Sequence, residues 1–160
     1  MVTLDEVILF IHILGATIWV GGTLSLGIVA AAMGSMLRDQ PALYSRVMSR
    51  VARSLGWTMW FALIVTVLTG LYNLTWFLPV LSWSAITSSP WLEAKIFLVV
   101  FLVLASGVHS FVLGPSLRKR AERHPPPAGI ARWRRWDRGI SILSLALTLG
   151  VLFAAVMLAN

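Results

Sequence analysis

Four long stretches of uncharged, mostly apolar residues run along the chain and are separated by short charged segments. No Asp, Glu, Lys or Arg occurs between residues 6 and 38, 53 and 93, 95 and 118, or after 138. A helix needs about 20 apolar residues to cross the hydrocarbon core of a membrane. We therefore predict an all-α integral membrane protein, a single four-helix bundle over residues 1–160 with helices at about 7–34, 55–78, 91–113 and 139–159.

The second uncharged stretch is long enough for two crossings, but its middle predicts a loop. Residues 79–90 read PVLSWSAITSSP, a Ser/Thr-rich segment between two prolines. Proline and clustered hydroxyl residues interrupt helices and mark turns at the membrane interface. The first stretch follows Asp5 and Glu6 and is longer than the apolar core of a signal peptide, so we expect a retained helix.

The charges are distributed unequally between the two sides of the predicted bundle. The chain is 58% hydrophobic, 12% charged and carries a net charge of +7. All its basic residues except Lys95 lie in the connections after the first and third helices. Cytoplasmic loops of membrane proteins are enriched in Lys and Arg, so we predict a multi-pass protein of the cytoplasmic membrane with both termini outside. Topology and the lipid bilayer account for the basic charge, and no nucleic acid is expected.

Residues 41–53 (PALYSRVMSRVAR) alternate apolar and arginine positions at helical spacing. Such a pattern is typical of an amphipathic helix on the inner leaflet that leads into the second crossing helix. A solvated charged face explains the same pattern equally well.

Function is to be sought among the few polar residues inside the membrane, because each is costly to place there. His12, Gly15, Trp19 and Gly22 follow three- and four-residue spacing and share one face of the first helix. A flat cofactor pressed against the glycines and ligated by His12 would use the whole face. The alternative is a glycine-mediated helix contact in which His12 bonds to a neighbouring hydroxyl.

The third helix carries Lys95 and His109 on one stripe, which suggests that the stripe faces the bundle interior. Snorkelling of Lys95 to the outer interface is the alternative. At 1.5 Å per residue, His12 lies roughly 8 Å below the outer surface, near Tyr72, Asn73 and Lys95. We predict that these four form one polar cluster. His109 lies about 27 Å down, too deep to share an iron with His12 in one subunit.

Imidazole is a common ligand of haem iron and also suits copper, so His12 and His109 are the predicted metal ligands. The methionines form no closely spaced pair inside a crossing helix, which weakens the case for copper. There is no cysteine, and therefore no disulfide or thiolate site. Neither paired carboxylates nor a nucleotide-binding loop is evident, so whether the protein is an enzyme stays open and any catalysis would depend on a cofactor.

Four segments carry a resemblance to a known family: 12–22 (HILGATIWVGG), 69–71 (TGL), 91–95 (WLEAK) and 109–115 (HSFVLGP). With these motifs in this order, the chain resembles the CopD-type membrane superfamily, which includes the copper resistance protein D domain and the HemJ-type protoporphyrinogen oxidases. The resemblance implies a helical bundle in the cytoplasmic membrane. For the HemJ-like branch it implies haem b and functional roles for His12 and Lys95. For the CopD-like branch it implies copper uptake.

Our leading functional prediction is a membrane protein that binds haem b and transfers electrons or handles a small redox ligand. Its predicted cofactor-binding residues are Gly15, Trp19, Gly22, Tyr72, Asn73 and Lys95. A membrane redox partner or quinone would then exchange electrons with the haem. The alternatives are copper transport, oxidation of a porphyrinogen, and an accessory role without a cofactor. Four helices of this length make a slender bundle, so a homo-oligomer is plausible.

Overall fold

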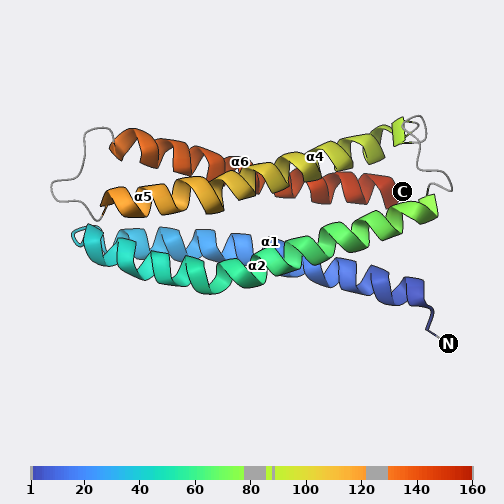
Figure 1. The fold of residues 1–160 in the computed structure, drawn as a ribbon, viewed down its shortest axis with the longest axis horizontal. Helices are drawn as coiled ribbons and strands as arrows, with labels where there is room; N and C mark the ends of the chain where they lie inside the picture. Colours follow the sequence, from blue (N-terminus) through green and yellow to red (C-terminus); the bar gives the residue numbers. More distant parts are fainter. Residues whose placement is uncertain (1, 78–85, 88, 122–129, 160) are drawn as a thin grey trace. The chain divides into compact units, whose positions relative to one another are not determined.

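The computed structural model describes residues 2–77, 86–87, 89–121 and 130–159, and these are helical almost throughout (Figure 1). They contain no β-strand. The elements are α1 (Leu4–Met36), α2 (Pro41–Phe77), α4 (Pro90–Gly107), the π-helix η1 (Val108–Leu113), α5 (Gly114–Ala121) and α6 (Ile130–Ala159).

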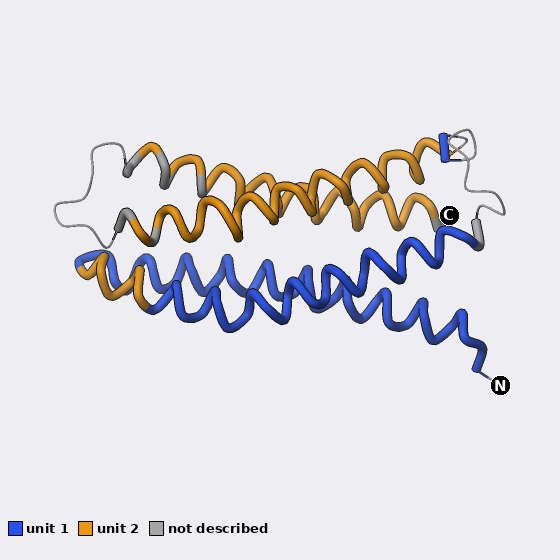
Figure 2. Tube along the Cα trace, in the orientation of Figure 1, with its two compact units in different colours: residues 1–39, 47–88 blue, residues 40–46, 89–160 orange. Residues whose placement is uncertain are grey.

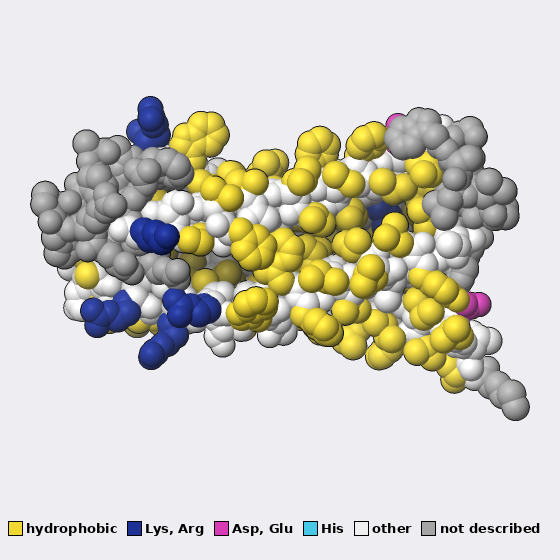
Figure 3. Space-filling model, in the orientation of Figure 1, with side chains coloured by type: hydrophobic (Ala, Val, Ile, Leu, Met, Phe, Trp, Pro, Cys, Tyr) yellow, Lys and Arg dark blue, Asp and Glu magenta, His cyan; other side chains and the backbone are white. Residues whose placement is uncertain are grey.

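Four segments are long and apolar enough to cross a membrane, as the sequence predicted. They are Leu4–Met36, Pro41–Thr75, Pro90–Leu117 and Arg138–Leu158. Large apolar side chains cover the face in view in Figure 3, and Phe10, Phe61, Phe101 and Phe153 each expose more than half of their surface. Exposed apolar side chains along helices of this length are compatible with lipid contact. The all-α class and the multi-pass membrane character are therefore confirmed, whereas the orientation of the termini stays a prediction.

The helices extend beyond the predicted boundaries, mostly at their polar ends. α1 already begins at Leu4, because Thr3 and Glu6 form a capping box that satisfies the first backbone N–H groups. α5 continues to Ala121, and α6 begins at Ile130 rather than at residue 139. The apolar pattern marks only the part of a helix that can lie in lipid. Arg, Lys and Ala are good helix formers and continue the helix beyond that part.

The amphipathic segment at 41–53 is helical, but it is not a separate element. It forms the first part of α2, which runs without interruption from Pro41 to Phe77. Pro41 occupies the first helical position, where its missing N–H costs nothing. At 1.5 Å per residue, the 37 residues of α2 measure about 55 Å, more than the roughly 30 Å of a hydrocarbon core.

The predicted loop at 79–90 lies largely outside the described residues. Its end is described: Ser89 is the N-cap of α4, and its side chain accepts a hydrogen bond from the backbone N–H of Leu92 at 3.4 Å. Pro90 follows at the first helical position. A polar cap followed by proline is a strong start signal for a helix.

The described chain divides into two compact units, each built around a pair of helices (Figure 2). Unit 1 comprises residues 1–39 and 47–88 and holds α1 and most of α2. Unit 2 comprises residues 40–46 and 89–160 and holds α4, η1, α5 and α6. The single domain over residues 1–160 stays a prediction.

Candidate functional site

In unit 1, the glycine face of α1 packs against α2. A Cβ added to Gly15 would collide with Thr66 Oγ1 and lie 3.1 Å from the carbonyl oxygen of Ala62. At Gly22 an added Cβ would lie 3.0 Å from Met59 Cγ and 3.2 Å from its Sδ. Side chains of α2 therefore take the space beside both glycines. The predicted alternative of a glycine-mediated helix contact is present, and a flat cofactor on this face would require α2 to move away.

His12 is held on α2 by its Nδ1 atom. This nitrogen lies 2.9 Å from the carbonyl oxygen of Thr66 and 3.1 Å from Thr69 Oγ1. A carbonyl oxygen only accepts hydrogen bonds, and the Thr69 hydroxyl itself donates to the carbonyl of Val65 at 2.7 Å. Nδ1 must therefore carry a proton, so in the neutral form of the ring the lone pair is on Nε2. Histidines that ligate metals commonly donate their other ring N–H to a carbonyl in this way.

Gly70 and Asn73 extend the surroundings of His12 along α2. A Cβ on Gly70 would lie 3.0 Å from His12 Cε1, so the absence of a side chain at this position lets the imidazole lie against the helix backbone. Asn73 follows Thr69 by four residues and lies on the same face. Its side chain is buried, and its Oδ1 accepts no hydrogen bond among the described residues. A buried carbonyl without a donor is costly and is therefore a candidate contact for a ligand.

Trp19 lies about two turns from His12 on α1 and packs edge-to-face on Trp60 of α2, with ring centroids 6.3 Å apart. It is buried, and its indole Nε1 donates to no acceptor among the described residues. Trp19 therefore contributes to the packing of α1 on α2, and its buried indole N–H has no acceptor among the described residues.

Tyr72, the other predicted member of this region, lies at its exposed rim. Its hydroxyl donates to Asp5 Oδ1 at 3.1 Å and so joins α2 to the first turn of α1. This places a carboxylate near the end of the helix pair that the sequence assigns to the outer surface. A carboxylate there would favour the approach of a cation.

In unit 2, Lys95 is half-buried on α4, about one turn after Pro90. Lys95 belongs to unit 2, whereas His12, Tyr72 and Asn73 belong to unit 1, so only the last three of the four residues in the predicted cluster lie in one unit. The structure brings together the regions of His12, Tyr72 and Asn73 along one pair of helices. The participation of Lys95 stays a prediction.

His109 lies in the π-helix η1, which the sequence analysis did not predict. The backbone N–H of Gly114 bonds to the carbonyl of His109, five residues earlier. Pro115 follows directly and has no N–H to donate to the carbonyl of Phe111, so the helix widens by one residue before it continues as α5. The proline six residues after His109 is the sequence signal that could have indicated this turn. Single π-turns in α-helices often occur at functional sites.

Near the middle of unit 2, several hydroxyl side chains are removed from the surface. Ser106 on α4 and Thr148 on α6 are both buried. Thr148 donates to the carbonyl of Ser144 at 2.8 Å, whereas Ser106 Oγ and Ser144 Oγ have no partner among the described residues. α4 and α6 pack on each other, so the interior of this helix pair contains polar hydroxyl groups.

The structure supplies contacts that sequence reasoning did not identify, namely those made by Met59, Trp60, Thr66, Thr69 and Gly70. Thr66 and Thr69 were visible as polar residues in a crossing helix, but nothing in the sequence paired them with His12. The described residues contain no group of three or more His, Cys, Asp or Glu side chains that could hold a metal ion. His12 and His109 as metal ligands, and the six predicted cofactor-binding residues, stay predictions.

Comparison with known proteins gives one family. The sequence pattern of the family described as copper resistance protein D (CopD) matches residues 49–159, from the early part of α2 to the end of α6. No curated protein and no solved structure matches the chain. The matched range includes Thr66, Lys95 and His109 but not His12. It covers more than two thirds of the sequence, and the chain belongs to the CopD family.

Proposed function

We propose that this protein moves copper ions across the cytoplasmic membrane. The observation that carries the proposal is the match to the copper resistance protein D family over residues 49–159. It favours the copper alternative of the sequence analysis over the haem b prediction, which gains no support from the family. Copper is then the cargo of the protein.

The geometry around His12 supports this proposal. Its Nδ1–H donates to the carbonyl of Thr66, which fixes the ring orientation and leaves the lone pair on Nε2. A neutral imidazole nitrogen is a good copper ligand. We infer that His12 binds copper near the outer end of α1 and that Asp5, which accepts from Tyr72, helps to attract the cation.

His109 is the second histidine inside a crossing segment, and it lies in the π-helix. By the depth assigned from the sequence, it lies nearer the cytoplasmic side than His12. His109 is therefore a second candidate copper ligand, at a different depth in the membrane. The positions of most basic residues support the cytoplasmic membrane as the location and both termini outside.

Transport by the purified protein in liposomes tests the proposal. Copper kept in the Cu(I) state by ascorbate is added outside, and a copper-sensitive dye trapped inside reports its entry. We expect entry well above that into protein-free liposomes. His12→Ala removes the proposed ligand itself, so it should lower the apparent affinity for copper by at least the roughly 10-fold to 100-fold that the loss of an outer-shell partner costs.

Thr17→Ala is the matched control, because Thr17 is exposed on the same helix and donates only to the carbonyl of Ile13. This variant should transport copper like the unchanged protein. Entry no faster than into protein-free liposomes would overturn the proposal. So would a Soret absorbance band that sharpens on reduction and is lost in His12→Ala, since that result would restore the haem prediction.

A further inference from the structure

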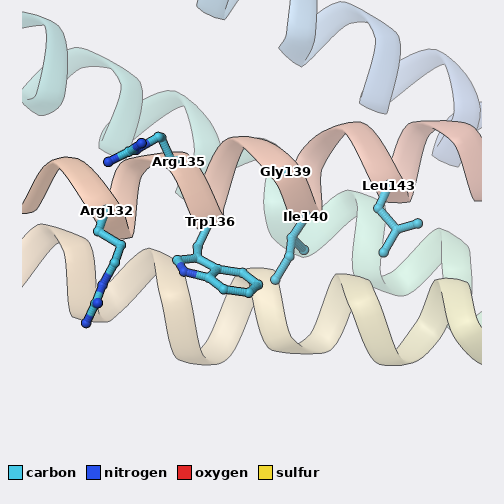
Figure 4. A pocket seen from close by; sticks show the side chains of 6 residues that line it. All are labelled: Arg132, Arg135, Trp136, Gly139, Ile140 and Leu143. Carbon is cyan, nitrogen blue, oxygen red and sulfur yellow. The ribbon is translucent and has the colours of Figure 1, made fainter.

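An open groove lies along one helix of unit 2, at the polar end of α6 (Figure 4). Its lining residues all come from α6: Arg132, Arg135, Trp136, Gly139, Ile140 and Leu143. They recur at intervals of three and four residues, so they occupy one broad stripe of the helix. In Figure 4 the side chains of Arg132, Trp136, Ile140 and Leu143 project from one side, and Arg135 extends along the other edge.

Gly139 creates the hollow in this stripe. A Cβ added there would meet no atom of the described residues within 4 Å, so no described element needs the glycine for close packing. This distinguishes Gly139 from Gly15 and Gly22, where a side chain of α2 occupies the space. The space beside Gly139 is open to an outside molecule.

Along the helix axis the stripe changes from basic residues at its N-terminal end to aliphatic residues at its C-terminal end. Arg132 and Arg135 are exposed and precede the segment that can cross a membrane, which begins at Arg138. Leu143 lies inside that segment with half of its surface exposed, and Trp136 lies between the two parts with 64% of its surface exposed. From Arg132 to Leu143 the groove covers about 16 Å at 1.5 Å per residue.

We propose that this groove binds one anionic phospholipid of the inner leaflet. The guanidinium groups of Arg132 and Arg135, at opposite edges of the stripe (Figure 4), would each reach towards its phosphate and donate N–H bonds to the phosphate oxygens. The indole of Trp136 would lie at headgroup level, where tryptophan is enriched in membrane proteins. The first part of an acyl chain would cross the open space at Gly139 and lie on Ile140 and Leu143.

The lining is basic at one end and aliphatic at the other, and an anionic lipid matches both ends. A free phosphate ion or a nucleotide would use the arginines but not the aliphatic end of the groove. A neutral phospholipid would use the aliphatic end but offer the arginines no net negative charge. A copper ion would be repelled by the two guanidinium groups, so the groove is independent of the copper-binding role proposed for His12.

Native mass spectrometry of the purified protein, released from neutral detergent, tests this inference. The probes are phosphatidylglycerol and phosphatidylcholine with identical acyl chains, each added over a range of concentrations. We expect one phosphatidylglycerol to bind at low concentration and phosphatidylcholine to bind only at much higher concentration. The double variant Arg132→Gln/Arg135→Gln should bind phosphatidylglycerol roughly 30-fold more weakly, from about 1 kcal/mol for each arginine.

Arg46→Gln/Arg50→Gln is the matched control, because both arginines are exposed on α2 and the loss of charge is the same. It should keep the tight binding. Gly139→Leu places a side chain in the hollow without removing a charge, and its Cβ meets no described atom within 4 Å, so it should weaken binding as well. Equal weakening in the two double variants, unchanged binding in Gly139→Leu, or equal binding of both lipids would each overturn the inference. Inorganic phosphate that competes at the same concentration as the lipid would also overturn it.

Discussion

At the scale of single residues, His12 combines a structural and a chemical role. Its Nδ1–H joins α1 to the carbonyl of Thr66 on α2, and the same bond determines which ring nitrogen keeps a lone pair. The sequence showed that His12 shares a face with Gly15 and Gly22, because helical spacing alone places them together. It could not show that α2 covers that face, since spacing within one helix says nothing about its neighbour.

The two kinds of glycine on α1 lead to a prediction for stability. Gly15→Ala should lower the free energy of unfolding by about 1–3 kcal/mol, because the new Cβ collides with Thr66 and crowds the carbonyl of Ala62. Gly21→Ala is the matched control, since an added Cβ there meets nothing within 4 Å. It should be neutral or stabilising by up to about 1 kcal/mol through helix propensity. Unfolding in mixed micelles of increasing denaturing detergent measures both, and equal midpoints would contradict the α1–α2 contact.

At the scale of elements, the crossing segments were predictable and the helix ends were not. Gaps in the charge pattern located all four crossings, because charge is excluded from lipid. Helix ends outside the lipid depend on caps and helix propensity, which is why α2 begins at Pro41 and α6 at Ile130. The π-helix at His109 was missed because one extra residue in a turn leaves the apolar pattern almost unchanged. Only Pro115 signals it.

The uninterrupted course of α2 is testable with proline. Ser54→Pro should destabilise the protein by about 3 kcal/mol or more, because proline in a helix interior removes a hydrogen bond and clashes with the preceding turn. If 41–53 were instead a separate interfacial helix that ended near residue 54, proline there would be tolerated. Ala42→Pro is the control, since position 42 lies in the first turn of α2, where the N–H has no partner within the helix. Thermal unfolding in detergent, followed by the loss of helical circular dichroism, distinguishes the two variants.

At the scale of the whole molecule, the proposals for copper and for lipid depend on the same orientation of the chain in the membrane. Copper entry at His12 requires the start of α1 to face outwards, and the lipid groove at Arg132 and Arg135 requires the start of α6 to face the cytoplasm. Both follow from one topology, in which the connections after the first and third crossing helices are cytoplasmic. Charge counting predicts this topology, whereas the arrangement of the helices alone is equally compatible with its inverse.

The absence of cysteine from the sequence makes the topology directly measurable. Single cysteines at Val2, Arg46 and Lys119, which are all exposed, can be probed in intact cells with a maleimide that does not cross membranes. We expect labelling of Val2→Cys in intact cells, and labelling of Arg46→Cys and Lys119→Cys only after permeabilisation. The reverse pattern would place His12 near the cytoplasm and the arginines of α6 outside. It would then contradict the assignment of the lipid to the inner leaflet and the entry of copper at the outer end of α1.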